Sequence, residues 1–216
     1  MHNFWLAEIL LALAAMLVAN QYCYIARQRC QSPALLVVAG LLCLALAAAA
    51  GAYRYGIDPG VTELHRALSR LSGTLSFLLI GLGMLWARLG LPLGRESRTP
   101  AYVAIVLVIA SALGAAESAV LTPQAVSSLY STIGLLLWLL VALLELGSAR
   151  TLTRSPALLL AAGAALVIVA GLVVGTSATR VLGLARMNWF HLLLAAGALS
   201  LLCARPLFAG GGRVDD

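Results

Sequence analysis

Long apolar runs follow one another along the chain, and short polar or proline-containing segments separate them. A helix needs about 20 mostly apolar residues to cross the hydrocarbon layer of a bilayer. The pattern predicts seven such helices, at residues 4–26, 33–53, 61–89, 101–121, 124–147, 156–176 and 187–207. We therefore expect an all-α membrane protein with one seven-helix domain, residues 1–208, and a disordered tail, residues 209–216.

Composition agrees with this class and excludes others. Hydrophobic residues make up 62% of the chain and charged residues only 10%, against about a quarter in soluble domains. The basic residues are all arginines, and without a lysine the chain cannot form the Schiff base of a retinal protein. The net charge of +6 lies mostly in the loops, which indicates membrane topology rather than a nucleic-acid partner.

The distribution of arginines predicts the orientation. Nine fall on one side of the predicted helices and five on the other, and the side with more arginines is normally cytoplasmic. The amino terminus is then outside and the carboxyl terminus inside. Because the chain is rich in alanine, leucine and arginine, we expect a bacterial inner membrane protein whose outer end faces the periplasm.

Ionisable residues gather near the predicted outer end. Glu8, His65, Glu117 and His191 each lie about 6 Å inside the end of a predicted helix. Such groups are costly in a membrane and usually face the bundle interior or a water-filled cavity. Their similar depth favours one outward-facing polar cavity, and the alternative is a set of separate hydrogen bonds at the membrane interface.

These residue types predict metal chemistry. Two histidines and a carboxylate are a ligand set for zinc, and a zinc-bound water can attack an ester or amide. His65 and His191 are the expected zinc ligands, with Glu8, Glu117 or Asp58 as the third ligand. A remaining carboxylate would act as general base.

Neighbouring residues supply substrate contacts and helix packing. An anionic head group would be held by Arg54, Arg66 or Arg186. Asn188 shares a helix face with His191, and His65, Ser69, Ser72 and Ser76 share another. Gly171 and Gly175 form a G-x-x-x-G pattern, which predicts close helix packing.

Seven helices with His65 and Ser69 in the third and His191 in the seventh resemble the CREST superfamily. It includes the alkaline ceramidases and adiponectin-receptor-like proteins, which are zinc-dependent membrane hydrolases. The resemblance implies that His65 and His191 bind zinc and that the Ser69 hydroxyl positions water or an oxyanion. The chain departs from the family at Met187, where the H-x-x-x-H pair of the last helix would begin, and in placing the site outward.

We therefore expect a metal-dependent hydrolase acting on a lipid or another membrane-embedded substrate. Two alternatives remain. His65 and His191 are also suited to bind a b-type haem between the third and seventh helices. The cavity could instead belong to a non-enzymatic membrane subunit that binds a ligand or a membrane protein partner.

Overall fold

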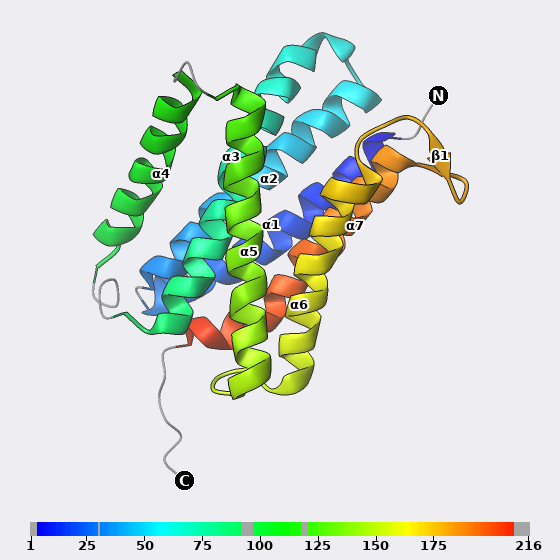
Figure 1. The fold of residues 1–216 in the computed structure, drawn as a ribbon. Helices are drawn as coiled ribbons and strands as arrows, with labels where there is room; N and C mark the ends of the chain where they lie inside the picture. Colours follow the sequence, from blue (N-terminus) through cyan, green and yellow to red (C-terminus); the bar gives the residue numbers. More distant parts are fainter. Residues whose placement is uncertain (1–3, 30, 92–96, 118–120, 210–216) are drawn as a thin grey trace.

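The computed structural model describes residues 4–29, 31–91, 97–117 and 121–209, which form a bundle of α-helices (Figure 1). The upper end of the bundle in Figure 1 is the end at which α1, α3, α5 and α7 begin, and the opposite end is the lower end. The third histidine of the sequence, His2, and the predicted tail beyond residue 209 lie outside the described residues. The α-helices are α1 (Phe4–Arg29), α2 (Ser32–Gly56), α3 (Thr62–Leu89), α4 (Thr99–Glu117), α5 (Pro123–Ser148), α6 (Arg154–Val169) and α7 (Arg186–Ser200).

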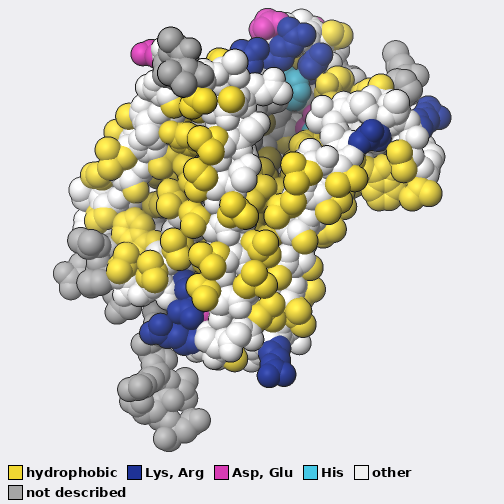
Figure 2. All heavy atoms as spheres, in the orientation of Figure 1, with side chains coloured by type: hydrophobic (Ala, Val, Ile, Leu, Met, Phe, Trp, Pro, Cys, Tyr) yellow, Lys and Arg dark blue, Asp and Glu magenta, His cyan; other side chains and the backbone are white. Residues whose placement is uncertain are grey.

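Most helix bounds lie within a few residues of the prediction. A 3₁₀ turn, Pro59–Val61, leads into α3, a π-helical turn, Ala170–Val174, continues α6, and a 3₁₀ segment, Leu201–Phe208, continues α7. Six of the described helical segments are long and apolar enough to cross a membrane, whereas the apolar part of α4, Thr99–Ala115, is shorter. Hydrophobic side chains cover the middle of the molecule, and arginines lie at its two ends (Figure 2).

Glycines allow the central helices to approach closely. A Cβ atom on Gly40 of α2 would lie 2.5 Å from the backbone oxygen of Ser76 in α3. On Gly134 of α5 a Cβ would overlap the backbone of Phe77 in α3. Small residues at such crossings are a common basis of helix packing in membrane proteins, where burial in lipid provides little hydrophobic driving force. The α2–α3–α5 contact therefore depends on these glycines.

The predicted packing role of Gly171 and Gly175 is wrong. A Cβ on either glycine would meet nothing within 4 Å among the described residues. The physical reason is that α6 ends in the π-helical turn, and Gly175, with φ of +66°, terminates it. The contact between α6 and α7 is made instead by Gly163 and Gly197, where a Cβ on Gly197 would lie 3.1 Å from the Gly163 oxygen.

Two parts of the molecule lie outside the compact bundle. Helix α4 runs along one side of it, with Ala101, Val108 and Ala112 buried and most other positions exposed (Figure 1). Between α6 and α7 the chain forms a short β-hairpin, whose two antiparallel strands have two residues each, β1 (Arg180–Val181) and β2 (Leu184–Ala185). The all-α prediction missed this hairpin, because its turn residues were read as a polar link.

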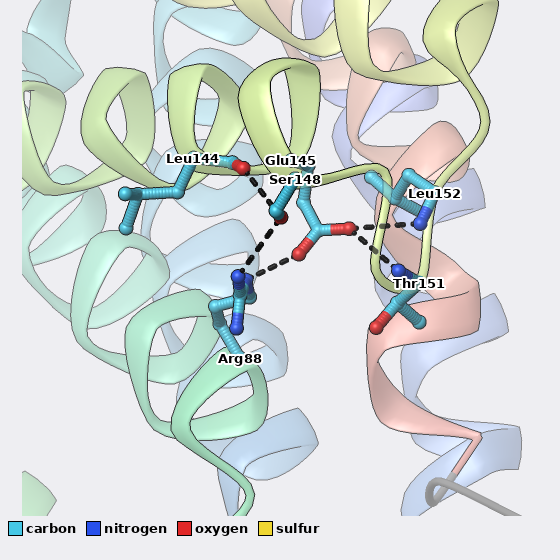
Figure 3. Close-up of polar contacts among 6 residues, drawn as sticks. All are labelled: Arg88, Leu144, Glu145, Ser148, Thr151 and Leu152. Atoms are coloured by element: carbon cyan, nitrogen blue, oxygen red, sulfur yellow. Dashed lines mark hydrogen bonds and ion pairs between the residues drawn. The ribbon is translucent and has the colours of Figure 1, made fainter. Parts of the chain in front are cut away.

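At the lower end, a buried ion pair joins α3 and α5 (Figure 3). The side chain of Glu145 is fully buried, and its Oε1 pairs with Nε of Arg88. Its Oε2 accepts hydrogen bonds from the backbone N–H groups of Thr151, at 2.9 Å, and Leu152, at 2.8 Å. Nη2 of Arg88 also donates to Oγ of Ser148, at 3.2 Å. These contacts join α3, α5 and the loop before α6.

Candidate functional site

A cleft of about 1200 Å³ opens at the upper end, and residues of α1, α2, α3, α5 and α7 line it. In Figure 2 it is a hollow that contains a histidine side chain beneath a group of arginines. Helix α7 contributes Met187, Phe190, His191 and Leu194, whose i, i+3, i+4 and i+7 spacing places them on one helical face. The mixture of polar and apolar lining is typical of a ligand-binding site.

Glu8 of α1 and His191 of α7 form a buried pair in the cleft wall. The side chains are 1% and 9% exposed, and Oε1 of Glu8 lies 3.4 Å from Nε2 of His191. Gly51 of α2 makes room for the carboxyl group, since a Cβ there would overlap it. Neither Oε1 of Glu8 nor Nδ1 of His191 makes a well-aligned hydrogen bond within the described part of the chain. A buried polar atom without a partner is unusual and indicates a place for a ligand or water.

His65 of α3 lies in the same cleft, under the ring of Tyr55. The two ring centroids are 5.8 Å apart in an edge-to-face arrangement. Nδ1 of His65 lies 3.3 Å from the carbonyl oxygen of Ala47 and 3.5 Å from Oγ of Ser69. Since a carbonyl only accepts hydrogen bonds, this geometry favours the tautomer with the proton on Nδ1 and a lone pair on Nε2.

The predicted serine face of α3 divides into two parts. Ser69 and Ser72 line the cleft. Ser76 is fully buried, and its Oγ lies 3.0 Å from Oγ of Ser72. Ser76 also lies against Gly40, so its role in the close contact between α2 and α3 explains why a serine is buried there. Only the upper two serines are available to a ligand.

Three arginines surround the mouth of the cleft. Arg54 lies 4.8 Å above the ring of Tyr55, and Arg66 is paired with Glu63 at 2.6 Å. Arg70, one helical turn after Arg66, forms no ion pair with any acidic side chain that the structure describes. The mouth therefore carries an excess of positive charge, which favours an anionic group.

Four of the predicted site residues do not join the cleft. Asp58 lies between α2 and the 3₁₀ turn Pro59–Val61 and does not line it. Glu117 is exposed at the end of α4, on the side of the bundle. Arg186 donates from Nη2 to the carbonyl oxygen of Val173 and thereby closes the end of α6. Asn188 does not line the cleft either. The six that do are Glu8, Arg54, His65, Arg66, Ser69 and His191.

The geometry gives a carboxyl–imidazole pair rather than a complete set of metal ligands. Among the described residues, no group of three or more His, Cys, Asp and Glu side chains is arranged to hold a metal ion. Axial binding of a haem by His191 through Nε2 would require separation from Glu8. Zinc and haem b both stay predictions from the sequence.

Several lining residues escaped the sequence analysis. Gln124, Ser127 and Ser128 begin α5 and face the cleft, although no motif singles them out. Tyr55, near the end of α2, packs its ring against that of His65. Among these residues, Arg70 was the easiest to predict from the sequence. It follows Arg66 at i+4 and therefore lies on the same face of the helix.

Comparisons with protein-family models, with curated proteins and with solved structures gave no match. The resemblance to the CREST superfamily therefore remains an expectation from the sequence.

Proposed function

We propose that the protein is an integral membrane protein that binds a membrane-embedded ligand with an anionic head group in the upper cleft. The main support for this proposal is that one cleft combines an arginine-rich mouth with a buried carboxyl–imidazole pair. Guanidinium groups suit phosphate and carboxylate oxygens, because their N–H groups can donate two parallel hydrogen bonds. Arg54, Arg66 and Arg70 would hold the head group at the mouth.

The Glu8–His191 pair favours proton transfer to or from the bound ligand. A carboxyl group beside an imidazole can exchange a proton with it, and the other ring nitrogen, here Nδ1 of His191, can then act on a group of the ligand or on a water. Hydrolysis of a lipid ester or amide is one reaction that such a pair can serve. A zinc-dependent version needs His65 to approach the pair as a third ligand, and metal analysis of wild-type protein and the variant His65→Ala would test it.

Binding to phosphatidylglycerol tests the head-group proposal. We expect purified protein in mixed micelles to bind phosphatidylglycerol more tightly than phosphatidylcholine, as followed by native mass spectrometry. The double variant Arg66→Gln/Arg70→Gln should bind it about tenfold more weakly, the usual effect of losing a hydrogen bond to a charged group.

The matched control is Arg150→Gln/Arg154→Gln, which removes the same charge from exposed positions at the lower end. It should bind phosphatidylglycerol like the wild type. Equal binding of the two phospholipids, or equal weakening by both double variants, would show that the upper arginines do not form an anion site.

A further inference from the structure

The cleft has a side opening as well as a mouth. The upper part of α5 packs on α3, where Oγ of Ser131 donates to the carbonyl oxygen of Gly73. Helix α5 meets α6 lower down, where Nε1 of Trp138 donates to the carbonyl oxygen of Leu160, at 3.1 Å. Above this contact α5 and α6 diverge, and a hollow lies between them (Figures 1 and 2).

The side opening is bordered by α5 and by the segment that leads from α6 into α7. Gln124, Ser127 and Ser128 line the cleft from α5, and Thr176 and Met187 line it from the other side. Ser128 is also exposed, as expected for a residue at the edge of an opening. Its neighbour Leu129 is 48% exposed but does not line the cleft.

The inner part of the cleft is apolar and reaches into the bundle. Leu11 and Phe190 line it together with Leu44, Phe77 and Leu194. Leu11 lies about 10 Å along α1 from its first residue, and Leu194 about 12 Å along α7. Ser128, at the edge of the side opening, lies about 8 Å along α5 from its first residue. Where the helix ends lie at the boundary of a hydrocarbon core about 30 Å thick, an opening at this depth faces acyl chains rather than water.

We infer that the ligand is a phospholipid of the adjacent leaflet, which enters sideways between α5 and the segment that leads from α6 into α7. Its phosphate would remain at the arginines of the mouth, while an acyl chain lies along the apolar part of the cleft and extends through the side opening. This inference rests on the proposed function. Sideways entry keeps the chain out of water, whereas entry through the mouth would expose it.

Two ligands distinguish binding of the acyl chain from binding of the head group. Phosphatidylglycerol carries both, and glycerol 1-phosphate carries the anionic group alone. We expect Ser128→Trp, which fills the side opening, to weaken phosphatidylglycerol binding at least tenfold and to leave glycerol 1-phosphate binding within twofold. The matched control Leu129→Trp places the same side chain one residue away, outside the cleft, and should leave both affinities unchanged. Thermal unfolding of each variant establishes that it is folded.

A chain-length series on wild-type protein tests the inference without any substitution. Short-chain phosphatidylglycerols that are dissolved as monomers in water should bind more tightly with each added methylene group, by up to about fourfold, because their chains then pass from water into the apolar cleft. If affinity is independent of chain length, or if folded Ser128→Trp binds phosphatidylglycerol like the wild type, sideways entry of a chain is wrong while the head-group site stands. If wild-type protein binds neither probe, the proposed function fails as well.

Discussion

The two ends of the bundle use similar chemical groups in opposite ways. At the lower end, the buried carboxyl group of Glu145 has an arginine and two backbone N–H groups as partners. At the upper end, the buried carboxyl group of Glu8 has a histidine neighbour at 3.4 Å, and Nδ1 of that histidine has no well-aligned hydrogen-bond partner among the described residues. The lower cluster holds helices together, whereas the upper pair is left with unused hydrogen-bonding capacity beside a cleft.

This difference separates a structural polar cluster from a candidate site. Burying a polar group is costly unless it is hydrogen-bonded, so a satisfied cluster needs no ligand to explain it. An under-satisfied buried pair beside a large cleft is more simply explained by a ligand or water. The same comparison predicts different responses to substitution at the two ends.

The largest effect is expected for Glu145→Ala. It leaves the mostly buried guanidinium group of Arg88 and two backbone N–H groups without their partner. Removing one member of a buried ion pair typically costs 3–5 kcal/mol, and we expect a loss of at least about 3 kcal/mol in the free energy of unfolding. Denaturation in detergent measures it. Glu63→Ala, at an exposed position, is the control, and equal effects of the two variants would contradict the structural role.

An intermediate effect is expected for Gly134→Ala. The added methyl group would overlap the backbone of Phe77, and the helices must separate to accommodate it. Overpacking of this kind costs about 1–3 kcal/mol. Gly147→Ala adds the same group to α5 where nothing described lies within 4 Å, so it should be neutral or slightly stabilising. Equal unfolding midpoints for the two variants would refute close α3–α5 packing.

The smallest effect on stability is expected for Glu8→Gln. Glutamine keeps the shape that packs against Gly51 and can still contact His191, so the free energy of unfolding should change by less than about 1 kcal/mol. Glu145→Gln, which makes the same substitution at the lower end, should cost clearly more. If Glu8→Gln is the more damaging of the two, the upper pair is a structural cluster, and the contrast between the ends disappears.

The sequence predicted the helices well because their signals are local. Thr122 caps α5 by accepting a hydrogen bond from the N–H of Ala125, at 3.2 Å, next to the predicted Thr-Pro break. Asp58 similarly accepts from the N–H of Gly60 in the predicted turn. The π-helical turn after α6 and the 3₁₀ segment after α7 carry no comparable local signal.

The site was predicted less completely because depth along a helix does not determine position around the bundle. Glu8 and Glu117 have similar predicted depths, but only α1 lies beside α7, whereas α4 lies at the edge. The pairing of Arg88 with Glu145 was missed for a related reason. An acid in an apolar helix needs a partner, but the sequence cannot say which of several nearby arginines provides it.

The contact between α1 and α7 has a consequence for biosynthesis. Helix α7 supplies His191 to Glu8, and the 3₁₀ segment that continues α7 supplies the carbonyl oxygen of Leu201 to the hydroxyl group of Tyr22, at 2.7 Å. Five other helices are synthesised between the two. Because a chain emerges from the ribosome in order, Glu8 is synthesised long before its partner exists. The cleft can therefore form only after α7 has been synthesised, and a chain interrupted before α7 would lack the partner of its buried carboxyl group.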